Sequence, residues 1–181
     1  MAELALPTVA VRESFLGAMD EFRGEGRGGP DDDSMVGSEL RGYGATWDTA
    51  EGFARYVADL RAAALEETPR PEGHVPSTTW WWVEGDQYLG RLAFRHRLTE
   101  HLREVGGHIG YDVRPSARRR GHATAMLAAA LPRVHGLGVP QVLITCDVDN
   151  VASRRVIESA GGRFDDERRG KLRFWVATGP Q

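Results

Sequence analysis

The stretch Arg114 to Leu127 reads RPSARRRGHATAML and is the most informative segment of this 181-residue chain. Four arginines fall within seven residues, and a glycine followed by small and apolar residues comes next. The preceding segment, GGHIGYDV, is predicted to be a strand that Pro115 ends, because proline cannot donate to a sheet ladder. The following segment, GHATAMLAAALPRVHGLG, is predicted to be a helix that Pro132 kinks or breaks. The arginines therefore lie in the turn between a strand and a helix N-terminus.

Such a turn suits a bound anion. The first N–H groups of a helix have no intrahelical partner, and the helix dipole adds partial positive charge there. Gly121 leaves room for close approach of a phosphate, and Ala123 keeps the next turn slim. Arginine adds bidentate, charge-assisted hydrogen bonds. A solvated basic turn is the alternative, and this stretch alone does not decide between the two.

Whole-chain composition limits the class of protein. With 41% hydrophobic and 27% charged residues, the chain is expected to fold as one globular domain. A net charge of −3 argues against a nucleic-acid partner, because phosphate-binding domains are usually basic. Cys146 is the only cysteine, which fits a reducing, cytoplasmic setting. No signal peptide and no membrane-spanning run are expected, and the histidines show no metal-ligand spacing, so no metal site is predicted.

The remaining segments are expected to alternate between strands and helices. The N-terminal part is predicted to contain a strand at 4–11, a helix at 13–22, a loop at 24–38 with Ser34 or Asp33 as helix caps, a helix at 48–65 and a proline-rich connector at 67–77. The C-terminal part is predicted to contain two strands within 78–98 that turn at 84–87, a strand at 139–148, a helix at 150–162 and a hairpin at 163–177. This order indicates an α/β fold.

Two motifs in this order carry a family resemblance. RxxGxA begins at Arg118, after the predicted strand that ends at Val113, and NxxS begins at Asn150, at the start of the helix after the next strand. Together they resemble the GNAT acetyltransferase superfamily, and most of all its bacterial branch with HIGYxxRPSxRxxGxA and CDxDNxASxxVIExxGG. The resemblance covers 78–177 well and the N-terminal part loosely. It implies a single GNAT-like α/β domain, with a mixed, mostly antiparallel central sheet flanked by helices.

The resemblance also implies an activity, a cofactor and a site. Acetyl-CoA would donate its acetyl group to an amine; 78–177 would form the acetyl-CoA-binding core, and 1–77 the acceptor side. In the family the glycine-containing turn holds the pyrophosphate, while the preceding strand and the Asn150 position lie along the pantetheine. The implied cofactor-binding residues are Val113, Arg118, Arg119, Arg120, Gly121, His122, Ala123, Thr124, Asn150 and Ser153. Similar enzymes are often dimers, so the resemblance allows a homodimer.

The catalytic residues are less defined. His108 is a candidate general base because histidine titrates near neutrality, with Glu84 and Asp147 as further candidates. Strand alternation places His108 on the opposite face from Tyr111 unless a bulge at Gly107 or Gly110 intervenes, so a structural histidine is the alternative. Many family members protonate the leaving thiolate with a tyrosine where this chain has Ile157. Tyr111 or solvent would donate instead.

Three functions stay open at this point. The first is an N-acetyltransferase acting on a small amine or an amino-acid-like acceptor. The second keeps the chemistry and makes the acceptor a protein or peptide. The third is a non-catalytic module that binds CoA or nucleic acid through the arginine turn. Trp80, Trp81 and Trp82 are expected in the core rather than in an aromatic cage for a ligand.

Overall fold

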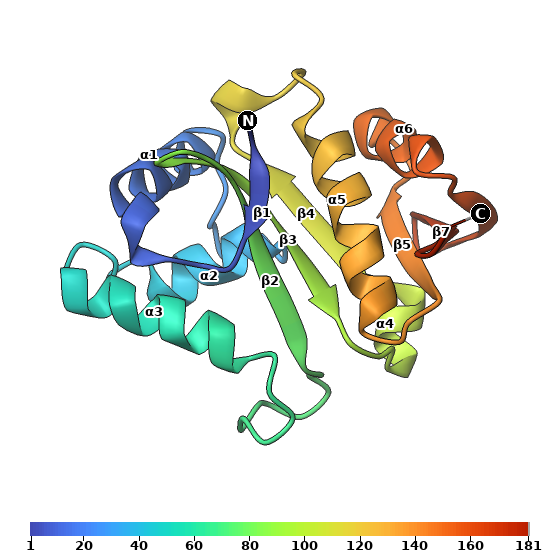
Figure 1. The fold of residues 1–181 in the computed structure, drawn as a ribbon, viewed down its shortest axis with the longest axis horizontal. Helices are drawn as coiled ribbons and strands as arrows, with labels where there is room; N and C mark the ends of the chain where they lie inside the picture. Colours follow the sequence, from blue (N-terminus) through green and yellow to red (C-terminus); the bar gives the residue numbers. More distant parts are fainter. Residues whose placement is uncertain (181) are drawn as a thin grey trace.

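A single seven-stranded sheet forms the centre of the molecule in the computed structural model, which describes residues 1–180. The spatial order is β1-β2-β3-β4-β5-β7-β6, and every neighbouring pair is antiparallel except β4 and β5 (Figure 1). The strands are β1 (Glu3–Ala5), β2 (Ser77–Glu84), β3 (Gln87–Arg95), β4 (Ile109–Val113), β5 (Gln141–Asp147), β6 (Arg163–Arg168) and β7 (Lys171–Ala177). The predicted mixed, mostly antiparallel α/β sheet is confirmed.

The only parallel pair in this sheet is also the place where it opens. β4 and β5 are joined at one register position, Ile109 opposite Ile144. β4 continues to Val113 with β3 as its partner, so its other edge has no strand beside it from Gly110 onward. Backbone donors and acceptors on such an edge need other partners. The separation leaves an opening between the two strands.

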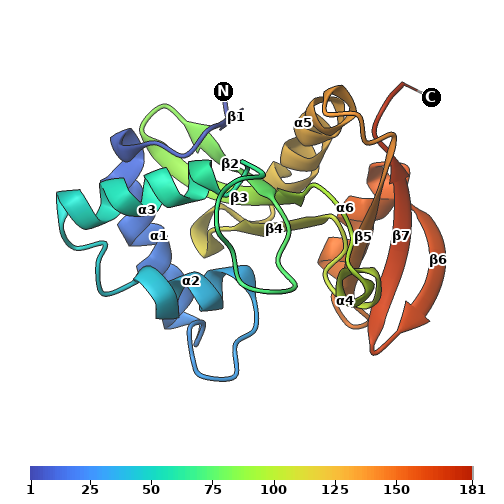
Figure 2. The same cartoon turned by 90° about the horizontal axis from the view of Figure 1, so that it is seen from below.

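Helices cover both faces of the sheet (Figure 2). They are α1 (Arg12–Gly24), α2 (Met35–Tyr43), α3 (Ala50–Ala62), α4 (Glu100–Glu104), α5 (His122–Gly136) and α6 (Val151–Ser159). Figure 2 shows α5 on one side of the strands, and α2 and α4 on the other. Among residues 1–180, no helix is long and apolar enough to cross a membrane.

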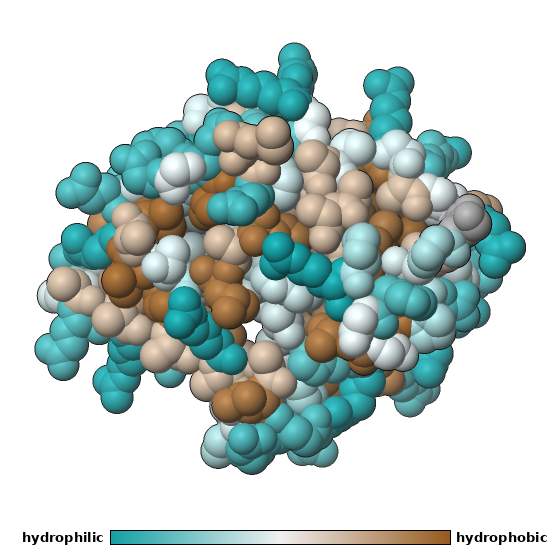
Figure 3. Space-filling model, viewed as in Figure 1, coloured by the Kyte–Doolittle hydropathy of each residue, from teal (hydrophilic) through white to brown (hydrophobic). Residues whose placement is uncertain are grey.

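Two hydrophobic cores result, and the three tryptophans of β2 divide between them. Trp80 and Trp82 pack with α5 and α6, together with Ile109 and Ile157. Trp81 points to the opposite face, as strand alternation requires, and joins the α1–α3 core. The space-filling view in Figure 3 shows apolar surface only as separate patches between polar side chains. The prediction that these tryptophans are core residues is confirmed.

The α1–α3 core is aromatic. Phe15 of α1 lies at its centre, with the ring centroids of Trp47, Tyr56, Trp81 and Tyr88 between 5.0 and 5.6 Å from its own. Two of these contacts, with Trp47 and Tyr88, are edge-on, a geometry that aromatic quadrupoles favour. This core fixes α1 firmly against the sheet next to β3.

Several predicted boundaries were wrong. The strand expected at 4–11 ends at Ala5, because Thr8 caps a short 3₁₀ helix at Val9–Val11. The loop expected at 24–38 ends earlier, since Ser34 caps α2, as one of the two predicted caps. The short helix α4 was not predicted.

Pro132 does not break α5. The helix runs through it to Gly136, because Leu131 and Val134 on either side are buried against the sheet and hold the last turn. Packing therefore outweighs the cost of the proline there.

Candidate active site

A cleft of about 670 Å³ lies where β4 and β5 separate. Its walls come from β4, the β4–α5 turn, the first turns of α5 and α6, and the segment after α1. Every predicted site residue except His108 and Arg120 lines it: Tyr111, Val113, Arg118, Arg119, Gly121, His122, Ala123, Thr124, Asn150 and Ser153. Residues far apart in sequence thus converge on the position that the arginine-rich turn indicated.

The turn presents bare backbone N–H groups to the cleft. Gly121 is the residue before α5, has φ of 80°, and offers no side-chain cap. A Cβ at Gly121 would meet no protein atom within 4 Å, so the space beside it is open. Arg119 also has a positive φ, 61°, which turns the chain sharply between the 3₁₀ segment Pro115–Ala117 and α5. A helix start without a cap, flanked by arginines, favours an anionic ligand.

Across the cleft, Asn150 and Ser153 organise the start of α6. The side-chain oxygen of Asn150 accepts a hydrogen bond from the Ser153 N–H at 3.0 Å. The Tyr111 hydroxyl lies 2.7 Å from the Ser153 hydroxyl. Burial raises the pKa of Tyr111 to about 12, so its phenol stays protonated at neutral pH. Tyr111 therefore keeps its phenolic proton and lines the cleft, whereas Ile157 is fully buried in the core.

His122 is the histidine that lines the cleft, and one of its ring nitrogens is already engaged. Trp82 donates its indole N–H to Nδ1 of His122 at 3.1 Å. Nδ1 therefore acts as an acceptor, which places any proton of the neutral ring on Nε2. This hydrogen bond ties the first residue of α5 to the core of the sheet.

His108 lies outside the cleft. Its Nδ1 accepts a hydrogen bond from the Leu143 N–H at 2.9 Å, and only 7% of the residue is exposed. Burial, aided by the charges of Arg103 and Arg95, lowers the pKa of His108 to about 4. The β3–β4 register is regular from Ile109 to Val113, and His108 lies outside the cleft that Tyr111 lines, as strand alternation predicts. These contacts favour the structural alternative for His108.

The two other candidate bases are engaged elsewhere. Glu84 pairs with the N-terminal amine of Met1 at 3.0 Å. Asp147 pairs with Lys171 across β5 and β7. Neither of them lines the cleft.

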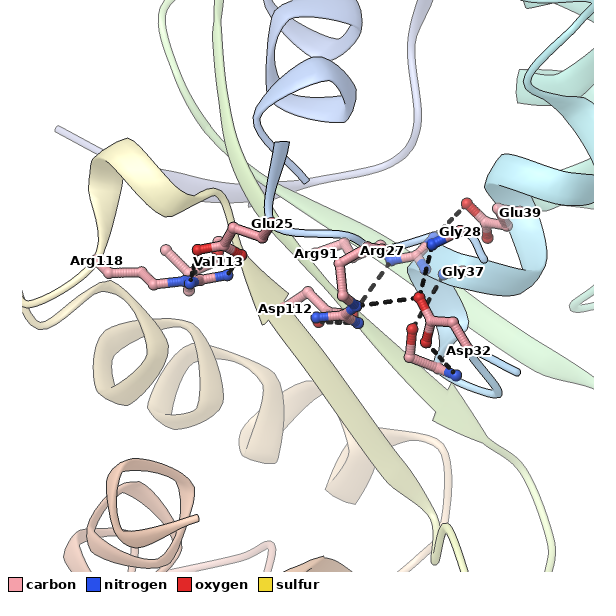
Figure 4. A network of polar contacts seen from close by, with 11 residues as sticks. Glu25, Arg27, Gly28, Asp32, Gly37, Glu39, Arg91, Asp112, Val113 and Arg118 are labelled. Carbon is pink, nitrogen blue, oxygen red and sulfur yellow. Dashed lines mark hydrogen bonds and ion pairs between the residues drawn. The ribbon is translucent and has the colours of Figure 1, made fainter. Parts of the chain in front are cut away.

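Sequence reasoning missed the third wall of the cleft, formed by Glu25, Arg27 and Asp112. Arg27 pairs with Asp32 at 3.2 Å and with Asp112 at 3.5 Å (Figure 4). Strand alternation could have placed Asp112 on the face opposite Tyr111. Glu25 and Arg27 carry no local signal, because they lie in a segment that looks like an ordinary polar loop.

A buried ion cluster backs this wall. Arg91 of β3 is almost fully buried, pairs with Glu39 of α2, and lies 4.0 Å from Asp112. Glu39 also accepts a hydrogen bond from Tyr56 at 2.5 Å. Burying a guanidinium charge is costly unless carboxylates compensate it, so Arg91, Glu39 and Asp112 form one linked unit. The pairing holds α2 against the sheet on the α1–α3 side of β4.

This is an α/β protein whose cleft can hold an extended, phosphate-bearing ligand. The cleft combines the open edge of β4, the uncapped N-terminus of α5 and flanking arginines. The chain belongs to the GNAT acetyltransferase family: the model of the acetyltransferase (GNAT) domain matches residues 38–163. It is therefore an enzyme of the acetyltransferase class. No curated protein sequence matches the chain.

Solved structures share the fold at low sequence identity. Mycobacterium smegmatis RimJ in complex with CoA-disulfide is 17% identical, with a TM-score of 0.66 over 97% of this chain and 81% of that one. The ribosomal-protein-S5-alanine acetyltransferase from Vibrio fischeri is 9% identical, with a TM-score of 0.67 over 98% and 93%. The microcin C7 self immunity acetyltransferase MccE, in complex with acetyl-CoA and AMP, is 11% identical, with a TM-score of 0.60 over 97% and 92%.

Proposed function

We propose that this chain transfers the acetyl group of acetyl-CoA to the α-amine at the N-terminus of a protein. The observation that carries the proposal is the cleft in which the open edge of β4 meets the uncapped start of α5. RimJ and the ribosomal-protein acetyltransferases among the structural neighbours support a protein acceptor rather than the small amine that the sequence favoured.

The residues of the cleft fit acetyl-CoA. The backbone N–H groups at the start of α5, with Arg118 and Arg119, would hold the pyrophosphate, and Arg120 would add charge from outside the cleft. The free edge of β4 near Val113, with Asn150 and Ser153, would hold the pantetheine arm. Acetyl-CoA supplies the activated acetyl thioester. In this assignment 78–177 forms the cofactor side and 1–77 the acceptor side of one domain.

The proton chemistry favours an α-amine. A lysine amine titrates near ~10.4, so deprotonating it at pH 7 costs about 4–5 kcal/mol, whereas an α-amine titrates near ~7.8 and costs about 1 kcal/mol. The larger free-energy cost of deprotonating a lysine amine would require a general base in the cleft. His108 lies outside the cleft, and Nδ1 of His122 already accepts a hydrogen bond from Trp82. Asp112 is the carboxylate on β4 that lines the cleft, and it would hold the cationic amine before water removes its proton.

Tyr111 would donate a proton to the departing CoA thiolate, which leaves as the thiol. Its phenol is protonated and is oriented by Ser153, and it lines the cleft. A thiol has a pKa of roughly 8.5, so it leaves tolerably even without full protonation. The donor accordingly accelerates the reaction without being indispensable.

The proposal also covers the origin, the cellular compartment and the oligomeric state of the enzyme. The motifs HIGYxxRPSxRxxGxA and CDxDNxASxxVIExxGG support the bacterial branch of the family. A single cysteine, Cys146, supports a reducing cytoplasm. A homodimer belongs to the same proposal, and light scattering of the purified protein tests it.

A panel of acceptors tests the proposal through release of the CoA thiol. Peptides with a free N-terminus should be turned over, and the same peptides with a blocked N-terminus and an internal lysine should not. The likeness to MccE makes a small-molecule amine the second candidate. Turnover of amino acids or nucleotide-linked amines without turnover of peptides would establish that candidate instead. If the folded protein neither binds CoA nor releases thiol, the cleft has been assigned wrongly.

A further inference from the structure

Helix α1 presents two glutamates to the β4–α5 turn. Glu21 and Glu25 are four residues apart, so both lie on the same face of the helix or just beyond its end. Each reaches an arginine of the turn more than ninety positions away in sequence, Glu21 holding Arg114 and Glu25 holding Arg118. The two contacts differ in burial and in their relation to the cleft.

Glu21 fixes the base of the turn. One of its oxygens accepts hydrogen bonds from Arg114 Nε at 3.1 Å and from the Ser116 hydroxyl at 2.9 Å, and the other accepts from the Ser116 N–H at 2.9 Å. Arg114 Nη2 also donates to Glu21, and the same guanidinium donates to the carbonyl oxygen of Tyr88 at 3.2 Å. Burial opposes ionisation, but these hydrogen bonds outweigh it and lower the pKa of Glu21. Glu21 does not line the cleft.

Glu25 lies in the cleft itself. It binds the Arg118 guanidinium through both oxygens, at 2.6 and 2.9 Å, and both side chains are about 40% exposed (Figure 4). Arg118 also donates to the Val113 carbonyl at 3.1 Å and lies over the Phe22 ring. A carboxylate therefore pairs with the guanidinium that would bind phosphate.

We propose that Glu21 and Glu25 act in opposite directions on cofactor binding: Glu21 positions the phosphate-binding turn, whereas Glu25 competes with the cofactor phosphates for Arg118. This inference rests on the proposed function, because it requires CoA to bind at the turn. When the cofactor binds, Arg118 exchanges one anionic partner for another, and Glu25 loses its partner in the cleft.

Titration calorimetry with CoA tests the opposition in three variants that each remove one negative charge. Glu21→Gln should raise the Kd about tenfold, because the turn loses its anchor. Glu25→Gln should lower the Kd about threefold at low salt, and the gain should shrink as salt screens the attraction. Asp20→Asn is the matched control, since Asp20 is exposed on the same helix and pairs only with Arg23. It should change the Kd less than twofold.

One further variant and one kinetic comparison distinguish this inference from a general loss of structure. Ser116→Ala removes one contact of Glu21 and should raise the Kd by less than Glu21→Gln does, with an unchanged melting temperature. In Glu21→Gln the KM for acetyl-CoA should rise with the Kd, while the KM for the acceptor stays the same. If both glutamate variants shift the Kd in the same direction, or neither does, the inference is wrong. If the wild-type protein does not bind CoA at all, the proposed function is wrong.

Discussion

The cleft offers two different kinds of binding group. The wall formed by β4, α5 and α6 offers mostly backbone: an open strand edge, an uncapped helix start and a glycine with φ of 80°. The third wall, formed by Glu25, Arg27 and Asp112, offers side chains, and ion pairs link Arg27 and Asp112 to Asp32 and to buried Arg91 outside the cleft. Backbone recognition depends on conformation and suits a ligand that never changes. A wall of paired charges can change its specificity through single substitutions, which suits the variable acceptor of an acetyltransferase.

The strongest test of the backbone wall is Gly121→Glu. A side chain at this position enters the open space of the cleft and brings negative charge to the phosphate site, so CoA affinity should fall at least a hundredfold. Gly138→Glu is the matched control: its φ of 84° is similar, and it also has open space around it. Calorimetry on both folded variants measures the contrast. Equal affinity in Gly121→Glu and wild type would place the pyrophosphate elsewhere.

His108 should contribute to stability and not to either wall. Its folded pKa of about 4 lies below the ordinary value near ~6.5, so the unfolded state binds a proton more readily. Stability is therefore complete above about pH 6.5 and is lost as pH falls towards 4, by about 2 kcal/mol at pH 5. Urea unfolding at pH 7.5 and pH 5 should show this loss in the wild type and a smaller loss in His108→Gln. A rate ionisation near neutrality that disappears in His108→Gln would instead make His108 the base.

Tyr111→Phe tests whether the backbone wall also carries a proton donor. The rate constant should fall about tenfold, because a thiol of moderate pKa needs only partial assistance. A phenol with a pKa near 12 stays protonated, so the wild-type rate should rise once with pH, as the acceptor amine loses its proton, and then stay level to about pH 10. The pH–rate profiles of both proteins measure this. An unchanged rate in Tyr111→Phe would leave the donor role to solvent.

The smallest expected effect separates two neighbouring arginines. Arg119 lines the cleft and Arg120 does not. Arg119→Ala should weaken CoA binding about fivefold at low salt and reduce its salt dependence, whereas Arg120→Ala should weaken it less than twofold. Affinities at two salt concentrations measure the difference. Equal losses in the two variants would mean that the turn acts only through its overall charge.

The sequence predicts those features of the fold and site that depend on interactions between residues close together in the chain. The strand, turn and helix around Gly121 were predicted because glycine, proline and residue alternation act locally, and the family resemblance implied that Asn150 belongs to the same site, whose cleft it lines. The contact between Glu25 and Arg118 spans 93 positions, and no local pattern indicates it. The sequence offered Ser34 as a helix cap, yet helix α2 after it was not predicted. The buried face of α2 includes Gly37, which adds no apolar side chain to the helical pattern. Strand alternation correctly predicted that His108 and Tyr111 lie on opposite faces, since only Tyr111 lines the cleft.

The hydrogen bond between Trp82 and His122 couples the fluorescence of one tryptophan to the first residue of α5. Trp82 has its rings in the core and its N–H on a residue that lines the cleft, whereas Trp81 faces the other core. A ligand that shifts the first turn of α5 will change the polarity around one indole and leave the other unaffected. Cofactor titrations should therefore change the intrinsic fluorescence of the wild-type protein, and Trp82→Phe should lose most of that change while the other four tryptophans continue to emit. The same indole would report each turnover in real time, without a label or a coupled assay.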